Sequence, residues 1–86
     1  MYNDERKGVS DKMDNISIEI GKRLRILREE KGLSVRDIEA MTSIPKSTVG
    51  LYENGNVDQK IGILKKLSEF YNEDIEWIIE LTDKRR

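Results

Sequence analysis

The sequence predicts a compact all-α protein of five short helices, and three observations lead to this prediction. Apolar residues recur at spacings of three and four along most of the chain, which is the period of an amphipathic helix. Serine, proline, asparagine and glycine stand where these runs begin and end, at positions that suit helix caps. The 86 residues are 38% charged and 36% hydrophobic, so we expect one small core.

The composition argues against an enzyme, a metal site and a cofactor site. The chain has no cysteine, which excludes disulfides and thiolate metal ligands. It has no histidine either, so the commonest general base and metal ligand is missing. No apolar run approaches the roughly 18 residues of a membrane span, and no signal-peptide pattern opens the chain. We therefore expect a cytoplasmic protein without a membrane partner.

Residues 1–14 have few apolar anchors and predict a flexible N-terminal tail before a folded domain at residues 15–83. An arm that follows DNA is the alternative for this tail. Its three basic groups are offset by four acidic residues, which disfavours this alternative. The acidic residues are Asp4, Glu5, Asp11 and Asp14.

The first helix is expected from about Ile16 to Lys31. Its apolar face consists of Ile16, Ile20, Leu24 and Leu27. Gly32 is able to adopt a positive φ and would stop the helix, after which Leu33 fills the corner.

Two short helices follow at residues 34–54. Ser34 is a good N-cap for a helix from about Val35 to Met41, with Ile38 and Met41 facing inward. Pro45 cannot continue a helix but suits the first turn of a new one. The third helix therefore runs from about Pro45 to Glu53, with Val49 and Tyr52 buried, and ends at Asn54-Gly55.

Two more helices complete the domain. The fourth has an apolar stripe and ends at Asn72, which tolerates the left-handed conformation; the stripe is Ile61, Leu64, Leu67 and Phe70/Tyr71. Asp74 is the expected N-cap of a fifth helix within residues 74–83. Residues 84–86 are expected to fray.

From about Ile20 to Ile79 the chain resembles the Xre-type helix-turn-helix family, the group of lambdoid phage repressors and Cro proteins. The resemblance covers residues 20–25, 27–34 and 44–49, the sequence Tyr52-Glu53-Asn54-Gly55, and the spacing of Ile61, Leu64 and Leu67. It implies a lambda-repressor-like DNA-binding domain whose second and third helices form the helix-turn-helix. It also implies double-stranded DNA as the partner.

The resemblance further implies a role for individual residues. Lys46, Ser47 and Leu51 match positions that usually face base edges. The matches to positions that contact the DNA backbone are Ser34, Val35, Thr48, Asn54 and Arg28. Arg28 and Glu53 also match a pair that links the first helix to the end of the third, and that structural role is the alternative for Arg28. Ser34 is likewise a helix cap whether or not DNA is bound.

Three features depart from the family pattern or stay open. Asn56 and Asp58 stand where basic residues are frequent, and Gln59 replaces a frequent proline, so we expect modest affinity for DNA. Gly50 costs helix stability, and either allows close approach of DNA or a partner or is a tolerated weakness. The net charge of −1, from 16 basic and 17 acidic residues, means that any basic surface depends on placement.

We therefore expect a non-enzymatic, sequence-specific transcriptional regulator, a repressor of phage or mobile-element type that binds an operator as a homodimer. Trp77, Ile78 and Leu81 of the fifth helix are the candidate dimer interface, although packing on the protein's own first helix is the alternative for Ile75, Ile78 and Ile79. A protein partner could regulate it. The other possible function is a protein-interaction module, such as an antitoxin or an accessory factor with weak DNA contact.

Overall fold

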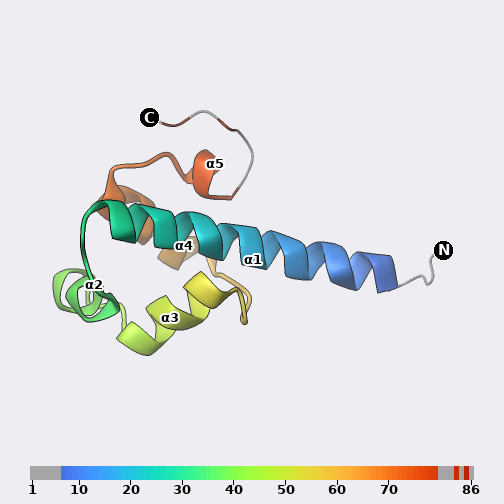
Figure 1. Cartoon of the computed structure of the whole chain (residues 1–86), viewed down its shortest axis with the longest axis horizontal. Coiled ribbons are helices and arrows are strands. Elements are labelled where there is room, and N and C mark those ends of the chain that lie inside the picture. Colours follow the sequence, from blue (N-terminus) through green and yellow to red (C-terminus); the bar gives the residue numbers. More distant parts are fainter. Residues whose placement is uncertain (1–6, 80–82, 84, 86) are drawn as a thin grey trace.

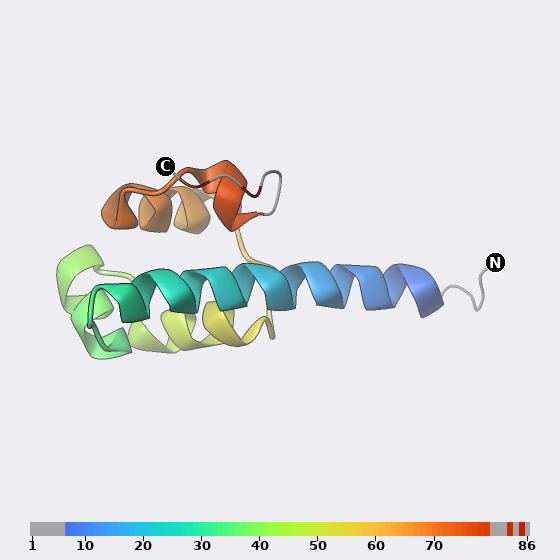
Figure 2. The same cartoon turned by 45° about the horizontal axis from the view of Figure 1, so that its top comes forward.

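The computed structural model describes residues 7–79, 83 and 85, and within them it contains helices and no strands. The helices are α1 (Lys7–Glu30), α2 (Val35–Thr42), α3 (Lys46–Asn54), α4 (Ile61–Tyr71) and α5 (Ile75–Ile78). Helix α3 lies below α1 and α5 lies above it in both views, with α2 near one end of α1 (Figures 1 and 2). Helix α4 lies behind α1 in Figure 1 and above it, beside α5, in Figure 2. The predicted all-α fold class is confirmed. None of the described helices is both long enough and apolar enough to cross a membrane.

Helix α1 begins at Lys7, much earlier than the start near Ile16 that the sequence predicts. Residues 7–14, assigned by the sequence to a flexible tail, are helical, while residues 1–6 lie outside the described part of the chain. A lack of apolar anchors does not itself end a helix, and residues 9–15 contain no glycine or proline to interrupt one. The extended α1 therefore projects beyond the other helices (Figure 2).

The start of α2 is a complete capping box. The Ser34 hydroxyl accepts a hydrogen bond from the Asp37 amide at 3.1 Å, and the Asp37 carboxylate accepts one from the Ser34 amide at 2.8 Å. The hydrogen bond from the Ser34 amide lowers the pKa of Asp37, because it favours the charged carboxylate. Ser34 and Asp37 together therefore satisfy backbone groups that the helix itself leaves without partners.

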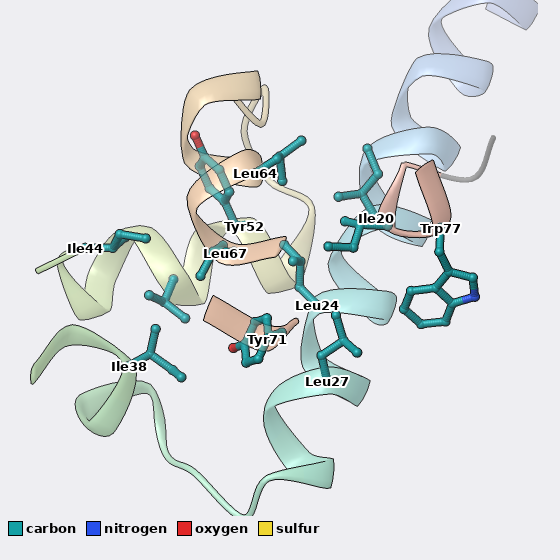
Figure 3. Close-up of a cluster of buried hydrophobic side chains, with 12 residues drawn as sticks. Ile20, Leu24, Leu27, Ile38, Ile44, Tyr52, Leu64, Leu67, Tyr71 and Trp77 are labelled. Carbon is teal, nitrogen blue, oxygen red and sulfur yellow. The ribbon is translucent and has the colours of Figure 1, made fainter. Parts of the chain in front are cut away.

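Twelve hydrophobic side chains form one core between the helices (Figure 3). They are Ile20, Leu24, Leu27, Ile38, Ile44, Val49, Tyr52, Leu64, Leu67, Tyr71, Trp77 and Ile78. Most of the residues that the sequence predicts to face inward are among them. Ile16 and Ile61 are exceptions, because Ile16 lies near the projecting part of α1 and Ile61 is the first residue of α4.

Met41 was predicted to face inward, and this prediction is wrong, because its side chain is 60% exposed. The inner face of α2 instead includes Val35, Ile38 and Thr42. The Thr42 hydroxyl donates to the Ile38 carbonyl at 2.7 Å and accepts from the Ile44 amide at 3.1 Å. A polar residue can therefore occupy the inner face of α2 where the sequence suggests methionine.

The end of α4 agrees with the prediction from the sequence, whereas the start of α5 agrees only in part. Helix α4 ends at Asn72, which has the expected positive φ of 57°. Asp74 precedes α5 as predicted, but its side chain makes no capping hydrogen bond. Arg85, expected to fray with its neighbours, makes two hydrogen bonds to Glu30 at 2.8 and 3.0 Å, while residues 84 and 86 lie outside the described residues.

Gly21 allows α1 and α3 to pack closely. A Cβ atom at this position would lie 2.3 Å from the Glu53 carbonyl oxygen, which is closer than any non-bonded contact allows. Gly50 is different, since a Cβ there would have no neighbour within 4 Å. The fold therefore requires glycine at position 21 and leaves open space around position 50.

Gly21→Ala and Gly50→Ala should change stability in opposite directions. The first overpacks the contact between α1 and α3 and should lower the free energy of unfolding by about 1–3 kcal/mol or more. The second removes a mid-helix glycine and should raise it by about 0.5–1 kcal/mol. Urea unfolding followed by circular dichroism measures both changes. Destabilisation by Gly50→Ala would contradict the open environment of that residue.

Candidate nucleic-acid interface

One face of α3 is exposed and carries the residues predicted to meet DNA. Lys46, Ser47, Leu51 and Asn54 are all exposed, and we call them the α3 surface. Ser47, Leu51 and Asn54 follow one another at helical spacings of four and three residues, with Lys46 in the same first turn. Gly50 lies on this face too. Thr48 is half-buried at its flank.

The first turn of α3 is capped by a residue from α2. Pro45 occupies the N-cap position and has no side-chain acceptor to offer. The Glu39 carboxylate accepts a hydrogen bond from the Lys46 amide at 3.2 Å in its place. The sequence predicts the start of α3 at proline but does not reveal Glu39, because the two residues meet only through the turn between the helices.

Ser34 and Val35 lie at the start of α2, where a phosphate contact was predicted. The Ser34 amide and one lone pair of its hydroxyl are used by the capping box, but the hydroxyl proton remains able to donate. The Val35 side chain packs partly against the core, which leaves its backbone amide in the first turn of α2 as the group for a phosphate. Ser34 and Val35 therefore each keep one donor that a DNA phosphate could accept from.

Glu53 and Arg28 form a buried ion pair between α3 and α1. Arg28 donates through Nε to one Glu53 carboxylate oxygen at 2.7 Å and through Nη2 to the other at 2.9 Å. The Glu53 side chain is 2% exposed and that of Arg28 is 16% exposed. The hydrogen bond to Glu53 raises the pKa of Arg28. Arg28 also donates to the Leu33 carbonyl at 2.8 Å, so this geometry favours its structural role over a DNA contact.

Arg25 also belongs to this site, although it is not among the residues that the sequence analysis assigns to DNA contact. Its Nη2 donates to the Asn54 side-chain oxygen at 3.2 Å, and its Nε lies 3.5 Å from Glu53 Oε1. With its oxygen engaged, Asn54 retains its amide N–H groups as donors. The Arg25 side chain is 49% exposed, so it adds positive charge beside Asn54. Arg25 lies four residues after Gly21 and three before Arg28, so it shares their face of α1. This helical spacing is the signal in the sequence that could have identified Arg25 as part of the site.

Gln59 has a structural role that the sequence does not reveal. Its side-chain amide donates to the Ser17 carbonyl at 2.8 Å and to the Tyr52 carbonyl at 3.0 Å, and so joins α1 to α3. The Tyr52 hydroxyl accepts from the Lys60 amide at 2.9 Å. The loop that departs from the family pattern is therefore attached to the end of α3, and its acidic residue Asp58 is exposed.

The predicted dimer residues of α5 lie inside the protein. Ile78 has no exposed surface and Trp77 is buried, which favours the alternative that this segment packs on its own fold. The Trp77 ring also has the guanidinium groups of Arg23 and Arg85 over it, each 4.7 Å from its centroid. Leu81 lies outside the described residues. Trp77 and Ile78 therefore offer little area to a second copy without rearrangement.

The family comparison agrees with this geometry. The family model described as "Helix-turn-helix" matches residues 24–78, which include the whole of α2, α3 and α4. This protein belongs to the Xre-type helix-turn-helix family. The membership favours a binding protein over an enzyme.

A relative from Methanocorpusculum labreanum extends the comparison of this helix-turn-helix protein. It carries the name "Putative HTH-type transcriptional regulatory protein" and is 36% identical over 59 residues. The aligned region covers 69% of this chain and 18% of the relative, so the chain spans less than a fifth of that protein. No solved structure matches the chain significantly.

Removing the charge of Glu53 should destabilise the helix-turn-helix protein strongly. Glu53→Gln leaves Arg28 without its charged partner in a mostly buried site, and such a loss costs about 3–5 kcal/mol. Glu29→Gln, at an exposed position of α1, is the control and should change the free energy of unfolding by about 0.5 kcal/mol or less. Urea unfolding measures both. Similar small effects of the two variants would show that the buried pair contributes little.

Tyr71 should make the protein sensitive to alkaline pH. Burial and the nearby charge of Glu53 raise the pKa of Tyr71 from 10.0 to about 12. The stability that Tyr71 contributes is therefore fully present below pH 10 and is lost as the pH rises through about 12. Tyr71→Phe should lack this loss, so its stability relative to the native protein should increase over this range. Urea unfolding at several pH values measures the difference, and a constant difference would contradict the prediction.

Proposed function

We propose that this protein is a sequence-specific DNA-binding transcriptional regulator, and that it acts as a repressor of phage or mobile-element type. The observation that carries the proposal is the exposed α3 surface, held on α1 by the buried pair of Arg28 and Glu53. The family membership and the name of the relative support DNA-binding regulation in general terms. In this proposal α3 enters the major groove, which is wide enough for a helix.

Bases would be read from the first turn of α3 and from Leu51. Lys46 is able to donate to guanine O6 or N7, and Ser47 can donate or accept. Leu51 offers an exposed apolar side chain that suits the methyl group of thymine. The three side chains together can therefore distinguish bases through different kinds of contact.

Phosphate contacts would lie at the two ends of the helix-turn-helix. At the start of α2, the Ser34 hydroxyl and the Val35 amide would donate to one phosphate, with Thr48 near the backbone on the flank of α3. At the end of α3, the Asn54 amide would donate to another, and the half-exposed Arg25 adds positive charge there. Arg25 replaces Arg28 in this proposal as the α1 residue nearest to DNA, because Arg28 is engaged by Glu53 and Leu33.

A homodimer would compensate for weak binding by each subunit. The net charge of −1 and the exposed Asp58 limit electrostatic attraction to DNA. Two half-sites about 34 Å apart would couple two such contacts into one stronger interaction. The burial of Trp77 and Ile78 leads us to propose no contact of theirs in this dimer. Control by a partner protein remains part of the proposal.

Exposed apolar side chains on α1 favour a second candidate function. Ile16, Ile18 and Ile26 are all exposed, as expected if α1 binds another protein. Under this alternative the protein is an interaction module, such as an antitoxin or an accessory factor, and its contact with DNA is weak.

Lys46→Ala tests the main proposal. We expect the native protein to bind DNA from upstream of its own gene in a gel-shift titration, with affinity that falls steeply between two salt concentrations. Loss of the Lys46 base contact should weaken this binding about tenfold. Lys66→Ala removes an exposed lysine of α4 and is the matched control, which should bind almost as well as the native protein.

Two results would count against parts of this proposal. If Lys46→Ala and Lys66→Ala weakened DNA binding equally, Lys46 would have no base-reading role. Absence of binding at micromolar protein, together with a stable complex with another protein, would instead favour the interaction module.

A further inference from the structure

An acidic side chain from α2, that of Glu39, lies beside the first turn of α3, where DNA is proposed to approach. Glu39 belongs to α2, but one of its carboxylate oxygens, Oε2, is 3.2 Å from the amide of Lys46, the first residue of α3. Pro45 provides no capping side chain, so Glu39 supplies the acceptor that this helix end needs. A carboxylate is also favourable at this end, because the helix dipole makes it positive.

Capping and the helix dipole both favour a carboxylate here, but neither requires the acceptor to carry a full charge. A serine or asparagine before α3 would cap without bringing negative charge towards DNA phosphates. Glu39 is exposed, and no ion pair joins it to a cation within the part of the chain that the structure describes. The charge therefore remains available to a ligand at the α3 surface.

We propose that Glu39 is a base-reading residue that accepts a hydrogen bond from N4 of a cytosine in the major groove. The inference rests on the proposed DNA-binding function and adds a specificity-determining residue to it. The Lys46 amide fixes Oε2, and the second oxygen, Oε1, has lone pairs for the base. An ionised carboxylate only accepts hydrogen bonds, which matches the amino group of cytosine and rejects the acceptor-rich edge of guanine.

Glu39 and Lys46 together suit the two bases of one G·C pair or of neighbouring pairs. Lys46 donates to guanine O6 or N7, while Glu39 accepts from cytosine N4. The two side chains start from adjacent points, since the Glu39 carboxylate contacts the Lys46 backbone. The charge of Glu39 also disfavours DNA without this contact, which improves discrimination at the expense of non-specific affinity.

Selection from a pool of duplexes with a randomised core tests the inference with native protein, Glu39→Gln and a control. Glutamine keeps an oxygen for the Lys46 amide, so Glu39→Gln preserves the cap. Its free energy of unfolding should stay close to that of the native protein and be lower only by the favourable interaction of the charge with the helix dipole. The control is Glu76→Gln, an equal charge change at an exposed position of α5, which packs on α1 and α4.

We expect the native protein and the control to select the same sequence, with a G·C pair at one position of each half-site. Glu39→Gln should lose about tenfold in discrimination at that position alone, or select A·T there, because glutamine pairs with adenine N6 and N7. Its affinity for non-specific DNA should rise.

Three results would overturn the inference. An unchanged selected sequence for Glu39→Gln would leave Glu39 as a cap only and leave the proposed function intact. Weaker binding of Glu39→Gln to DNA whatever the base at each position, together with a lower free energy of unfolding, would also leave Glu39 as a cap only. Failure of the native protein to select any sequence would remove both the inference and the proposed DNA-reading function.

Discussion

The contact between α1 and the end of α3 is the constraint on which the rest of the structure depends. Gly21 allows the two helices to approach, and the buried Glu53 carboxylate then requires Arg28 as its partner. A helix of nine residues is not stable in isolation, so α3 takes both its stability and its direction from α1. The close packing and the two-oxygen ion pair together leave little freedom for α3 to rotate, which keeps its exposed face in one orientation.

Each end of α3 is completed by a side chain from another helix. Glu39 of α2 caps the start, and Arg25 of α1 contacts Asn54 at the end. Gln59 and Tyr52 then attach the following loop to the same end. These contacts use the polar groups that face the protein, so the outward groups of Lys46, Ser47 and Asn54 stay available for a ligand. The arrangement of a rigid scaffold with outward donors is what recognition of a major groove requires.

Charge placement matters more than total charge in this protein. The basic and acidic residues almost cancel over the whole chain, yet Arg25 and Lys46 lie near opposite ends of α3. The acids near them have specific partners, since Glu53 pairs with Arg28 and Glu39 holds the Lys46 amide. Such a surface would bind random DNA weakly and would depend on base contacts for much of its affinity. Under our proposals, specificity and weak non-specific binding have the same physical origin.

The sequence by itself determined the helices and most of the core, because helical spacing and caps are local properties. It correctly predicted the Ser34 start of α2, the Asn72 end of α4 and the inward face of Ile20, Leu24 and Leu27. Only the tertiary structure decided that Met41 is exposed. The start of α1 at Lys7 has a local reason instead, since residues 9–15 contain no glycine or proline to interrupt a helix. The tertiary structure also decided which residues support the site, since Glu39, Arg25 and Gln59 act through partners 7 to 42 positions away in the chain. Such contacts depend on how helices cross, and no local pattern encodes that crossing.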